Sequence, residues 1–238
     1  MAAGQWRPPA IHRVSTGEWP ERRPRVLRDA KRLCQVGGVS WIVAGLLFMA
    51  RSVLDHIAGP PPSNGTEILA WVASHKLALA LSSEVLFFAT MALVPGVIAL
   101  HQTLVGTSRA TAATGCGIIA TVVPVMAVLL IVHGRLVYPV YGLRVDTPAA
   151  AELVVAIFYG GLHVVSLLMA VATFVLSLPM RSGAYGPRIA YLGFATSVVD
   201  VVGGYPDAIG ALPALVCQAF FAAWFVVVGA RLRRIAPA

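Results

Sequence analysis

The chain alternates between long apolar stretches and short polar segments. About 20 helical residues, each rising ~1.5 Å, are needed to cross ~30 Å of hydrocarbon. Six stretches come close to that length: residues 36–54, 77–100, 110–133, 153–178, 189–205 and 213–230. The fifth is the weakest, because it is short and contains Thr196, Ser197 and Asp200. The pattern predicts an all-α, polytopic bundle of six transmembrane helices in one domain, residues 33–234.

The overall composition agrees with a protein whose solvent is lipid. Hydrophobic residues make up 58% of the 238 residues and charged residues only 12%. The mean hydropathy is +0.80, a value that a water-soluble domain rarely reaches. Cys34, Cys116 and Cys217 are far apart in the sequence and form no closely spaced pair. The cysteines therefore predict neither a disulfide framework nor a zinc site.

Lysine and arginine residues flank the six stretches unevenly. With the N-terminus in the cytoplasm, fourteen of the eighteen basic residues fall on the cytoplasmic side: Arg7, Arg13, Arg22, Arg23, Arg25, Arg28, Lys31, Arg32, Arg109, Arg181, Arg188, Arg231, Arg233 and Arg234. The outer side keeps Arg51, Lys76, Arg135 and Arg144. Because positively charged loops tend to remain inside, we expect both termini in the cytoplasm and the protein in the cytoplasmic (inner) membrane of a bacterium.

Residues 1–32 differ from the rest of the chain. They contain Pro8, Pro9, Pro20 and Pro24 among many charges and show no helical or strand period, which predicts a disordered cytoplasmic tail. Its basic residues favour contact with anionic lipids. We expect no nucleic-acid binding, because no recognised binding module surrounds the few aromatic residues of the tail. The bilayer is the expected partner, and an unidentified membrane protein or a second copy of the chain stays open.

Four ionisable residues inside the spans are the best candidates for a functional site. They are Arg51, Glu84, His163 and Asp200, and the expected topology places all four in the outer half of the membrane. Ionisable groups in hydrocarbon cost several kcal/mol unless they are paired or hydrated. One interpretation is therefore a set of structural pairs, such as Arg51 with Glu84 or Asp200. The other is an outward-facing cavity that binds a proton, a cation or a small polar ligand.

Helical phase predicts how two of the spans meet. At 100° per residue, one face of residues 153–178 carries the polar residues Tyr159, His163, Ser166, Thr173 and Ser177, continuing the phase of Glu152. A second polar and small-residue face, Gly193, Thr196, Ser197, Asp200, Gly203 and Gly204, lies on the fifth span. Small residues allow close helix packing in membranes. We expect the two spans to pack along these faces.

A membrane-embedded metal or haem site is the alternative hypothesis. His133 and His163 could face each other across a bundle, with Glu84 as a further ligand. The chain has no G-x-S-x-G, H-E-x-x-H or phosphate-binding glycine motif, so the sequence identifies no catalytic residue and we expect no cofactor. Pro95 and Pro124 lie within the second and third spans, where each predicts a local kink.

Three segments resemble a family of bacterial six-helix integral membrane proteins of unknown function. The main one, residues 158–194, has an aromatic-rich G-x-H stretch, a short turn rich in Arg, Ser, Gly and Pro, and a glycine-bearing helix; residues 31–48 and 220–234 are similar to the ends of that family. The resemblance implies a fold and a location, and it draws attention to His163. The leading expectation is a non-enzymatic protein that binds or conducts a small polar ligand or ion from the outer face, or serves as an accessory or sensing subunit. A metal- or haem-binding enzyme or redox subunit is the alternative.

Overall fold

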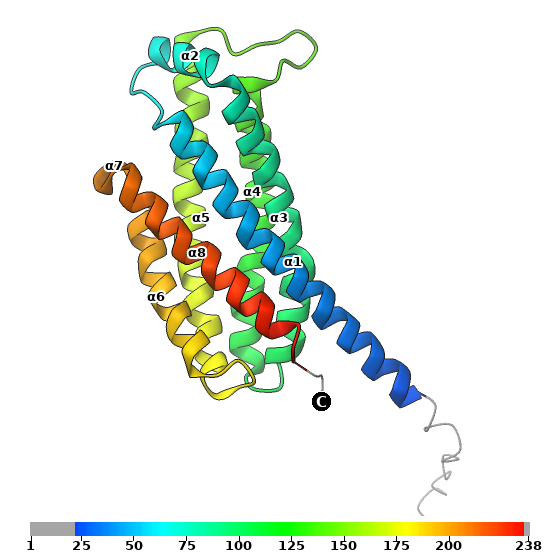
Figure 1. Cartoon of the computed structure of the whole chain (residues 1–238). Helices are drawn as coiled ribbons and strands as arrows, with labels where there is room; N and C mark the ends of the chain where they lie inside the picture. The colour runs from blue at the N-terminus through cyan, green and yellow to red at the C-terminus, as the bar shows by residue number, and fades with distance from the viewer. Residues whose placement is uncertain (1–21, 236–238) are drawn as a thin grey trace, which may run out of the picture.

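The computed structural model describes residues 22–235, and these residues form eight helices (Figure 1). The helices are α1 (Arg22–Ala58), α2 (Gly65–Ser74), α3 (Lys76–Leu104), α4 (Arg109–Val137), α5 (Pro148–Ser182), α6 (Pro187–Gly203), α7 (Pro206–Ile209) and α8 (Ala211–Leu232). Five helices are long and apolar enough to cross a membrane: α3, α4, α5 and α8 over their whole length, and α1 over Arg28–Ala58. The chain is therefore a multi-pass α-helical membrane protein.

Each of the six apolar stretches lies almost entirely within a helix, but the helices differ in length. The fifth stretch corresponds to α6, which has 17 residues, or about 26 Å at 1.5 Å per residue. That helix is shorter than the five that meet the criteria of length and composition for a membrane span. The stretch also ends earlier than predicted, because the helix stops at Gly203 and Tyr205 precedes the short α7. Six crossings thus remain a prediction, whereas five are supported by length and apolarity.

The first helix begins inside the segment that was expected to be a tail. Residues 22–32 are helical and continue into the first span without a break. The expectation of a disordered segment therefore does not hold for residues 22–32. Residues 1–21 lie outside the described residues.

The long helices pack in a closed ring. Helix α1 packs against α3 and α8, α3 against α4, α4 against α5, α5 against α6, and α6 against α8 (Figure 1). The ring therefore brings the first long helix against the last. One consequence is that residues far apart in the sequence share the same interior.

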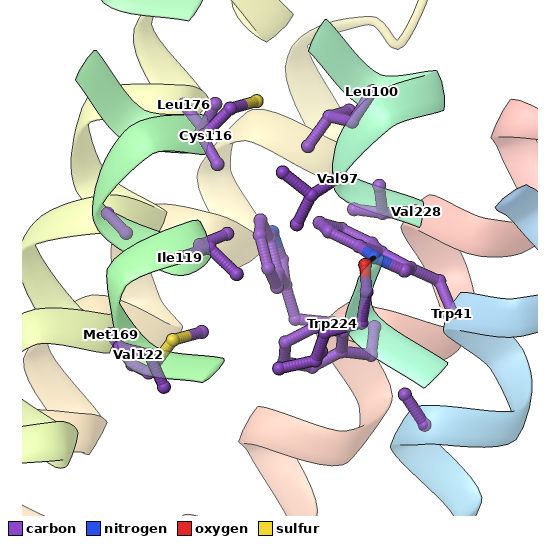
Figure 2. Close-up of a cluster of buried hydrophobic side chains, with 14 of the residues drawn as sticks. Trp41, Val97, Leu100, Cys116, Ile119, Val122, Met169, Leu176, Trp224 and Val228 are labelled. Atoms are coloured by element: carbon purple, nitrogen blue, oxygen red, sulfur yellow. Dashed lines mark hydrogen bonds between the residues drawn. The ribbon is translucent and has the colours of Figure 1, made fainter. Parts of the chain in front are cut away.

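The main core of the ring is aromatic where α1, α3 and α8 meet (Figure 2). Trp41 is fully buried and packs against Trp224 and Phe225, with ring centroids 5.4 and 4.9 Å apart. Gly96 faces the Trp41 indole so closely that a Cβ on this glycine would lie 1.5 Å from a ring carbon. Only glycine fits at this point of α3.

Pro95 lies within α3 one turn after carbonyls that accept hydrogen bonds from α1. Ser40 Oγ donates to the carbonyl of Ala92 at 2.7 Å, and Trp41 Nε1 donates to the carbonyl of Leu93 at 3.2 Å. A proline disturbs the hydrogen bonding of the preceding turn, and neighbouring helices commonly satisfy the affected groups. The carbonyl that loses its intrahelical donor is that of Met91, four residues before Pro95, and the two carbonyls bound by α1 are the next two along the chain.

A separate apolar cluster lies at one end of the bundle, beneath α2 (Figure 1). The sequence analysis did not predict this helix. Asn64 caps it by accepting a hydrogen bond from the Glu67 amide at 2.9 Å. Glu152 at the start of α5 accepts from the Gly65 amide at 2.6 Å. The Trp71 indole donates to the carbonyl of Ala58 at 2.8 Å, so α2 is fixed to the ends of both α1 and α5.

Candidate functional site

Asp200 lies on α6, less than one turn before the helix ends at Gly203. The side chain is 4% exposed, and its Oδ2 atom has no hydrogen-bond partner among the described residues. A buried carboxylate oxygen without a partner carries a desolvation cost that nothing nearby offsets. The contacts of Asp200 with its neighbours therefore do not explain why this side chain is buried.

The faces predicted for the fourth and fifth spans do meet, and this interface places Asp200. Helices α5 and α6 pack together, and a Cβ on Gly193 would lie 2.0 Å from Ser177 Oγ. Thr173, Thr196 and Ser197 are buried in the same region. The predicted packing is confirmed, and it turns Asp200 towards the interior.

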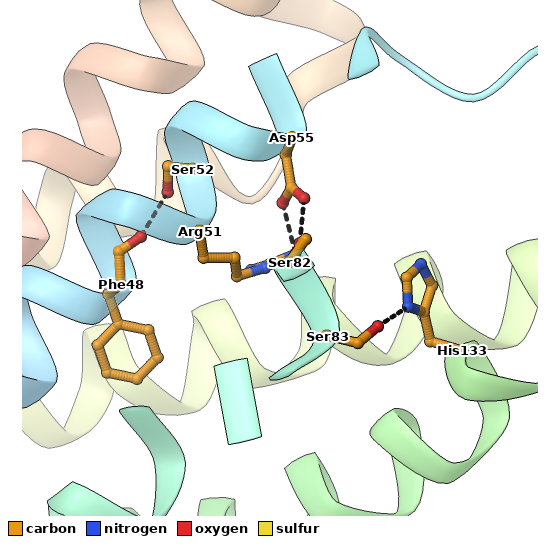
Figure 3. Close-up of polar contacts among 7 residues, drawn as sticks. All are labelled: Phe48, Arg51, Ser52, Asp55, Ser82, Ser83 and His133. Carbon is orange, nitrogen blue, oxygen red and sulfur yellow. Dashed lines mark hydrogen bonds and ion pairs between the residues drawn. The ribbon is translucent and has the colours of Figure 1, made fainter. Parts of the chain in front are cut away.

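Arg51 lies on α1 and uses only part of its hydrogen-bonding capacity. Its Nη2 atom forms an ion pair with Asp55 Oδ2 at 2.9 Å, one helical turn further along (Figure 3). Ser82 of α3 donates to the other oxygen of Asp55 at 2.5 Å. The Nε atom of Arg51 is buried, and no described residue accepts its hydrogen. Glu84 or Asp200 was the partner expected from the sequence, but the ion pair that Arg51 forms is with Asp55.

A small cavity connects Arg51 and Asp200. Its volume is about 80 Å³, and each of the six long helices contributes to its lining. The polar side chains in the lining are Arg51, Ser166, Asp200 and Gln218, and the other lining side chains are apolar. Sites for organic ligands usually measure about 300–1,000 Å³, so this cavity has the size for an ion or a few water molecules. A larger hollow of about 460 Å³ on the surface of α1 has no ionisable lining residue.

His163 lies outside the lining of this cavity. Its Nδ1 atom donates to the carbonyl of Gly204 at 2.7 Å, since a carbonyl can only accept. The imidazole also packs edge-on against Tyr205, with ring centroids 4.7 Å apart. These contacts hold the end of α6 against α5. His163 therefore positions the helix that carries Asp200.

Glu84 is exposed on α3, on a different face from its buried neighbours Ser82 and Ser83. Partial burial, and then the nearby Glu84 carboxylate, raise the pKa of Tyr138, which follows α4. Glu84 does not line the cavity. Of the four predicted site residues, the structure brings Arg51 and Asp200 to one void and places His163 and Glu84 elsewhere.

His133 is also accounted for by structural contacts. It is 2% exposed and hydrogen-bonded to Ser83 Oγ at 2.5 Å (Figure 3). It also stacks on Phe158, with ring centroids 4.1 Å apart. Within residues 22–235 no group of three or more His, Cys, Asp or Glu side chains could hold a metal ion. His133, His163 and Glu84 thus do not form a three-residue group that could hold a metal ion in this part of the chain.

Two residues of the site region escaped the sequence analysis. Asp55 could have been found, because Arg51 and Asp55 have the i, i+4 spacing at which opposite charges pair on a helix. Gln218 gave no such signal, since one amide on an apolar helix does not reveal which helices surround it. We find no family model, curated protein or solved structure that matches this chain. The interpretation of the site therefore rests on its geometry.

Proposed function

We propose that this protein binds a proton or a small cation at Asp200, in a cavity that opens towards the outer face of the membrane. The observation that carries the proposal is the pair of buried, unpartnered polar atoms, Asp200 Oδ2 and Arg51 Nε, in residues that line one small void. Two such groups in a packed membrane protein are costly. A bound ion with its water would offset that cost.

The charges around the cavity favour a positive ligand. Asp55 already neutralises Arg51, because the two side chains form an ion pair at 2.9 Å. Asp200 has no counter-ion in the described part of the chain. Ser166 and Gln218 add neutral oxygen atoms to the same lining, and oxygen ligands suit hard cations. A proton on the carboxyl group is the smallest ligand that meets the same need.

The place of Asp200 along α6 supports access from the outer side. Three residues separate it from the end of the helix at Gly203, which is about 4.5 Å of helix. Figure 1 shows α7 set back from the end of the bundle where α2 lies. On the side towards that end, fewer helical turns of α6 lie beyond Asp200 than lie beyond a residue at the same level of α5.

The proposal includes six crossings with both termini inside, in the cytoplasmic membrane of a bacterium, and membership of the six-helix family of unknown function that the sequence resembles. The turn between α3 and α4, the turn between α5 and α6, and the end of α8 lie at one end of the bundle (Figure 1). Arg109, Arg181, Arg188 and Arg231 occupy this end, as positively charged cytoplasmic segments do. The same arginines favour contact with anionic lipids.

Cysteine labelling tests this topology. The three native cysteines are buried, and Tyr141, in the loop between α4 and α5, is fully exposed. An impermeant maleimide should label Tyr141→Cys in intact cells and Arg188→Cys only after the membrane is permeabilised. Labelling of Arg188→Cys in intact cells would overturn the proposed orientation.

The binding proposal is tested with the full chain in lipid nanodiscs. The melting temperature is measured in LiCl, NaCl and KCl against choline chloride at equal ionic strength, and in choline chloride as a function of pH. We expect the wild-type melting temperature to respond to at least one alkali cation or to pH. Asp200→Asn should lose that response, whereas Asp207→Asn, an exposed carboxylate on α7, should retain it. The proposal fails if the wild type shows no response or if Asp200→Asn keeps it.

A further inference from the structure

The guanidinium group of Arg51 is only partly hydrogen-bonded. A guanidinium group has five N–H donors in a rigid plane. In Arg51 one edge of that plane binds Asp55 at 2.9 Å, while the buried Nε atom has no partner in the described part of the chain. The arginine is thus anchored on one side and unsatisfied on the other.

Asp200 could serve as an alternative partner for the unsatisfied side of the Arg51 guanidinium. Arg51 and Asp200 line the same cavity of about 80 Å³, and the carboxylate of Asp200 has an unpartnered oxygen. Among the described residues Arg51 forms its ion pair with Asp55 and not with Asp200. Opposite charges that share a low-dielectric void attract each other strongly, so another contact must hold the guanidinium away from Asp200.

That contact is with Asp55, and a second helix stabilises it. Ser82 of α3 donates to Asp55 Oδ1 at 2.5 Å, while Arg51 binds Oδ2 (Figure 3). The Asp55 side chain is 29% exposed and that of Arg51 14% exposed. The pair therefore lies between the outer surface and the cavity. The other titratable groups with electrostatic interactions with this pair are His133 of α4 and Tyr159 of α5.

We propose that Asp55 is a positioning residue that holds Arg51 away from Asp200 and so keeps the Asp200 carboxyl group available to the proton or cation. The inference rests on the proposed function. If Asp55 lost its charge, Arg51 would turn to Asp200, form a buried ion pair there and occupy the cavity. The ligand would then compete with an internal counter-ion of the same sign.

The first test uses the cation and pH responses of the full chain in nanodiscs. Asp55→Asn keeps the size of the side chain and removes its charge, so the midpoint concentration of the responding ion should rise at least tenfold. The double variant Asp55→Asn/Arg51→Gln should restore the wild-type midpoint, because the competing cation is gone. Asp146→Asn, an exposed acid of the loop before α5, is the matched control and should change nothing.

A second readout does not depend on the ligand. Melting temperatures of Arg51→Gln, Asp200→Asn and the double variant are compared in the wild-type background and in the Asp55→Asn background. The two substitutions should be additive when Asp55 is present and strongly non-additive when it is replaced, because the Arg51–Asp200 pair forms only then.

The outcomes separate the two proposals. A merely structural role of Asp55 predicts a loss of ion response that Arg51→Gln does not rescue, and that result would overturn the inference. Additivity in both backgrounds would overturn it as well. If Asp200→Asn keeps the wild-type ion response, the proposed function fails, and the melting-temperature cycle still decides whether Asp55 controls the partner of Arg51.

Discussion

Helix α1 contributes to two regions of the bundle that are built in opposite ways. Trp41 enters a region without spare volume, where two aromatic rings surround the indole and Gly96 leaves it just enough room. Arg51 lies ten residues further along α1, about 15 Å of helix, and borders the cavity that contains Asp200. The same six helices thus form a tight interior and a hollow one.

The two regions also differ in how their buried polar groups are hydrogen-bonded. Next to the aromatic core, the Trp41 indole and the Ser40 hydroxyl both donate to backbone carbonyls, whereas the buried Trp224 indole nitrogen has no partner among the described residues. Around the cavity, Asp200 Oδ2 and Arg51 Nε are left without described partners. The cavity differs from the aromatic region because its two unpartnered atoms belong to ionisable side chains that line one void. This difference is the basis of the proposed function, in which a bound ion with its water would complete the hydrogen bonding of the cavity.

The largest expected effect comes from removing the space around Trp41. Gly96→Ala puts a methyl group on the indole ring and should destabilise the protein by about 3 kcal/mol or more. Gly117→Ala, on an open surface of α4 with nothing within 4 Å, should be neutral or stabilise by up to about 1 kcal/mol. Unfolding of both variants in detergent checks this, and equal stabilities would mean that the aromatic region is not tightly packed.

At the cavity, in contrast to Gly96, we expect one substitution to raise the stability of the protein. Asp200→Leu replaces an unpartnered carboxylate with an apolar side chain and should raise the stability by about 1–2 kcal/mol. Asp55→Leu should lower it by a similar amount, because it removes the partner of both Arg51 and Ser82. The two melting temperatures should therefore move in opposite directions. A loss of stability in Asp200→Leu would show that Asp200 is a structural residue.

The smallest expected effect is a difference in stability between substitutions of two buried threonines. Thr90 and Thr196 are both fully buried, but Thr90 donates to the carbonyl of Leu86 at 2.7 Å, whereas Thr196 Oγ1 has no partner in residues 22–235. Thr90→Val should cost about 1 kcal/mol, and Thr196→Val should be neutral or slightly stabilising. Equal losses in thermal unfolding would mean that Thr196 has a partner, such as water, that the contacts of the chain do not include.

The sequence was sufficient to predict the helices because their apolar length dominates the pattern. It also predicted the meeting of α5 and α6, since a polar face on each had to be buried. The start of α1 at Arg22 and the cap formed by α2 were not predicted. The N-cap Asn64 and the spacing of Ile68, Trp71 and Val72 were the signals that could have revealed α2.

The site was predicted in part, and the reason is geometric. Depth along a helix groups residues that lie at one level, but it does not say which side of the helix they occupy. Glu84 has the expected depth and yet points away, because the buried face of α3 follows Leu79, Ser83 and Leu86. The ring order, which brings α1 beside α8, depends on tertiary packing. No local pattern could therefore place Gln218 and Arg51 on the lining of one cavity.

The closure of the ring by α8 bears on how the protein is made. This helix leaves the ribosome after the other helices of the bundle, yet it supplies Trp224 and Phe225 to the aromatic core and Gln218 to the cavity. Until it inserts, the Trp41 indole has its neighbours on α3 but lacks the Trp224 and Phe225 rings. Biogenesis therefore requires a late step, and nascent chains that stall before residue 211 should be substrates for membrane quality control.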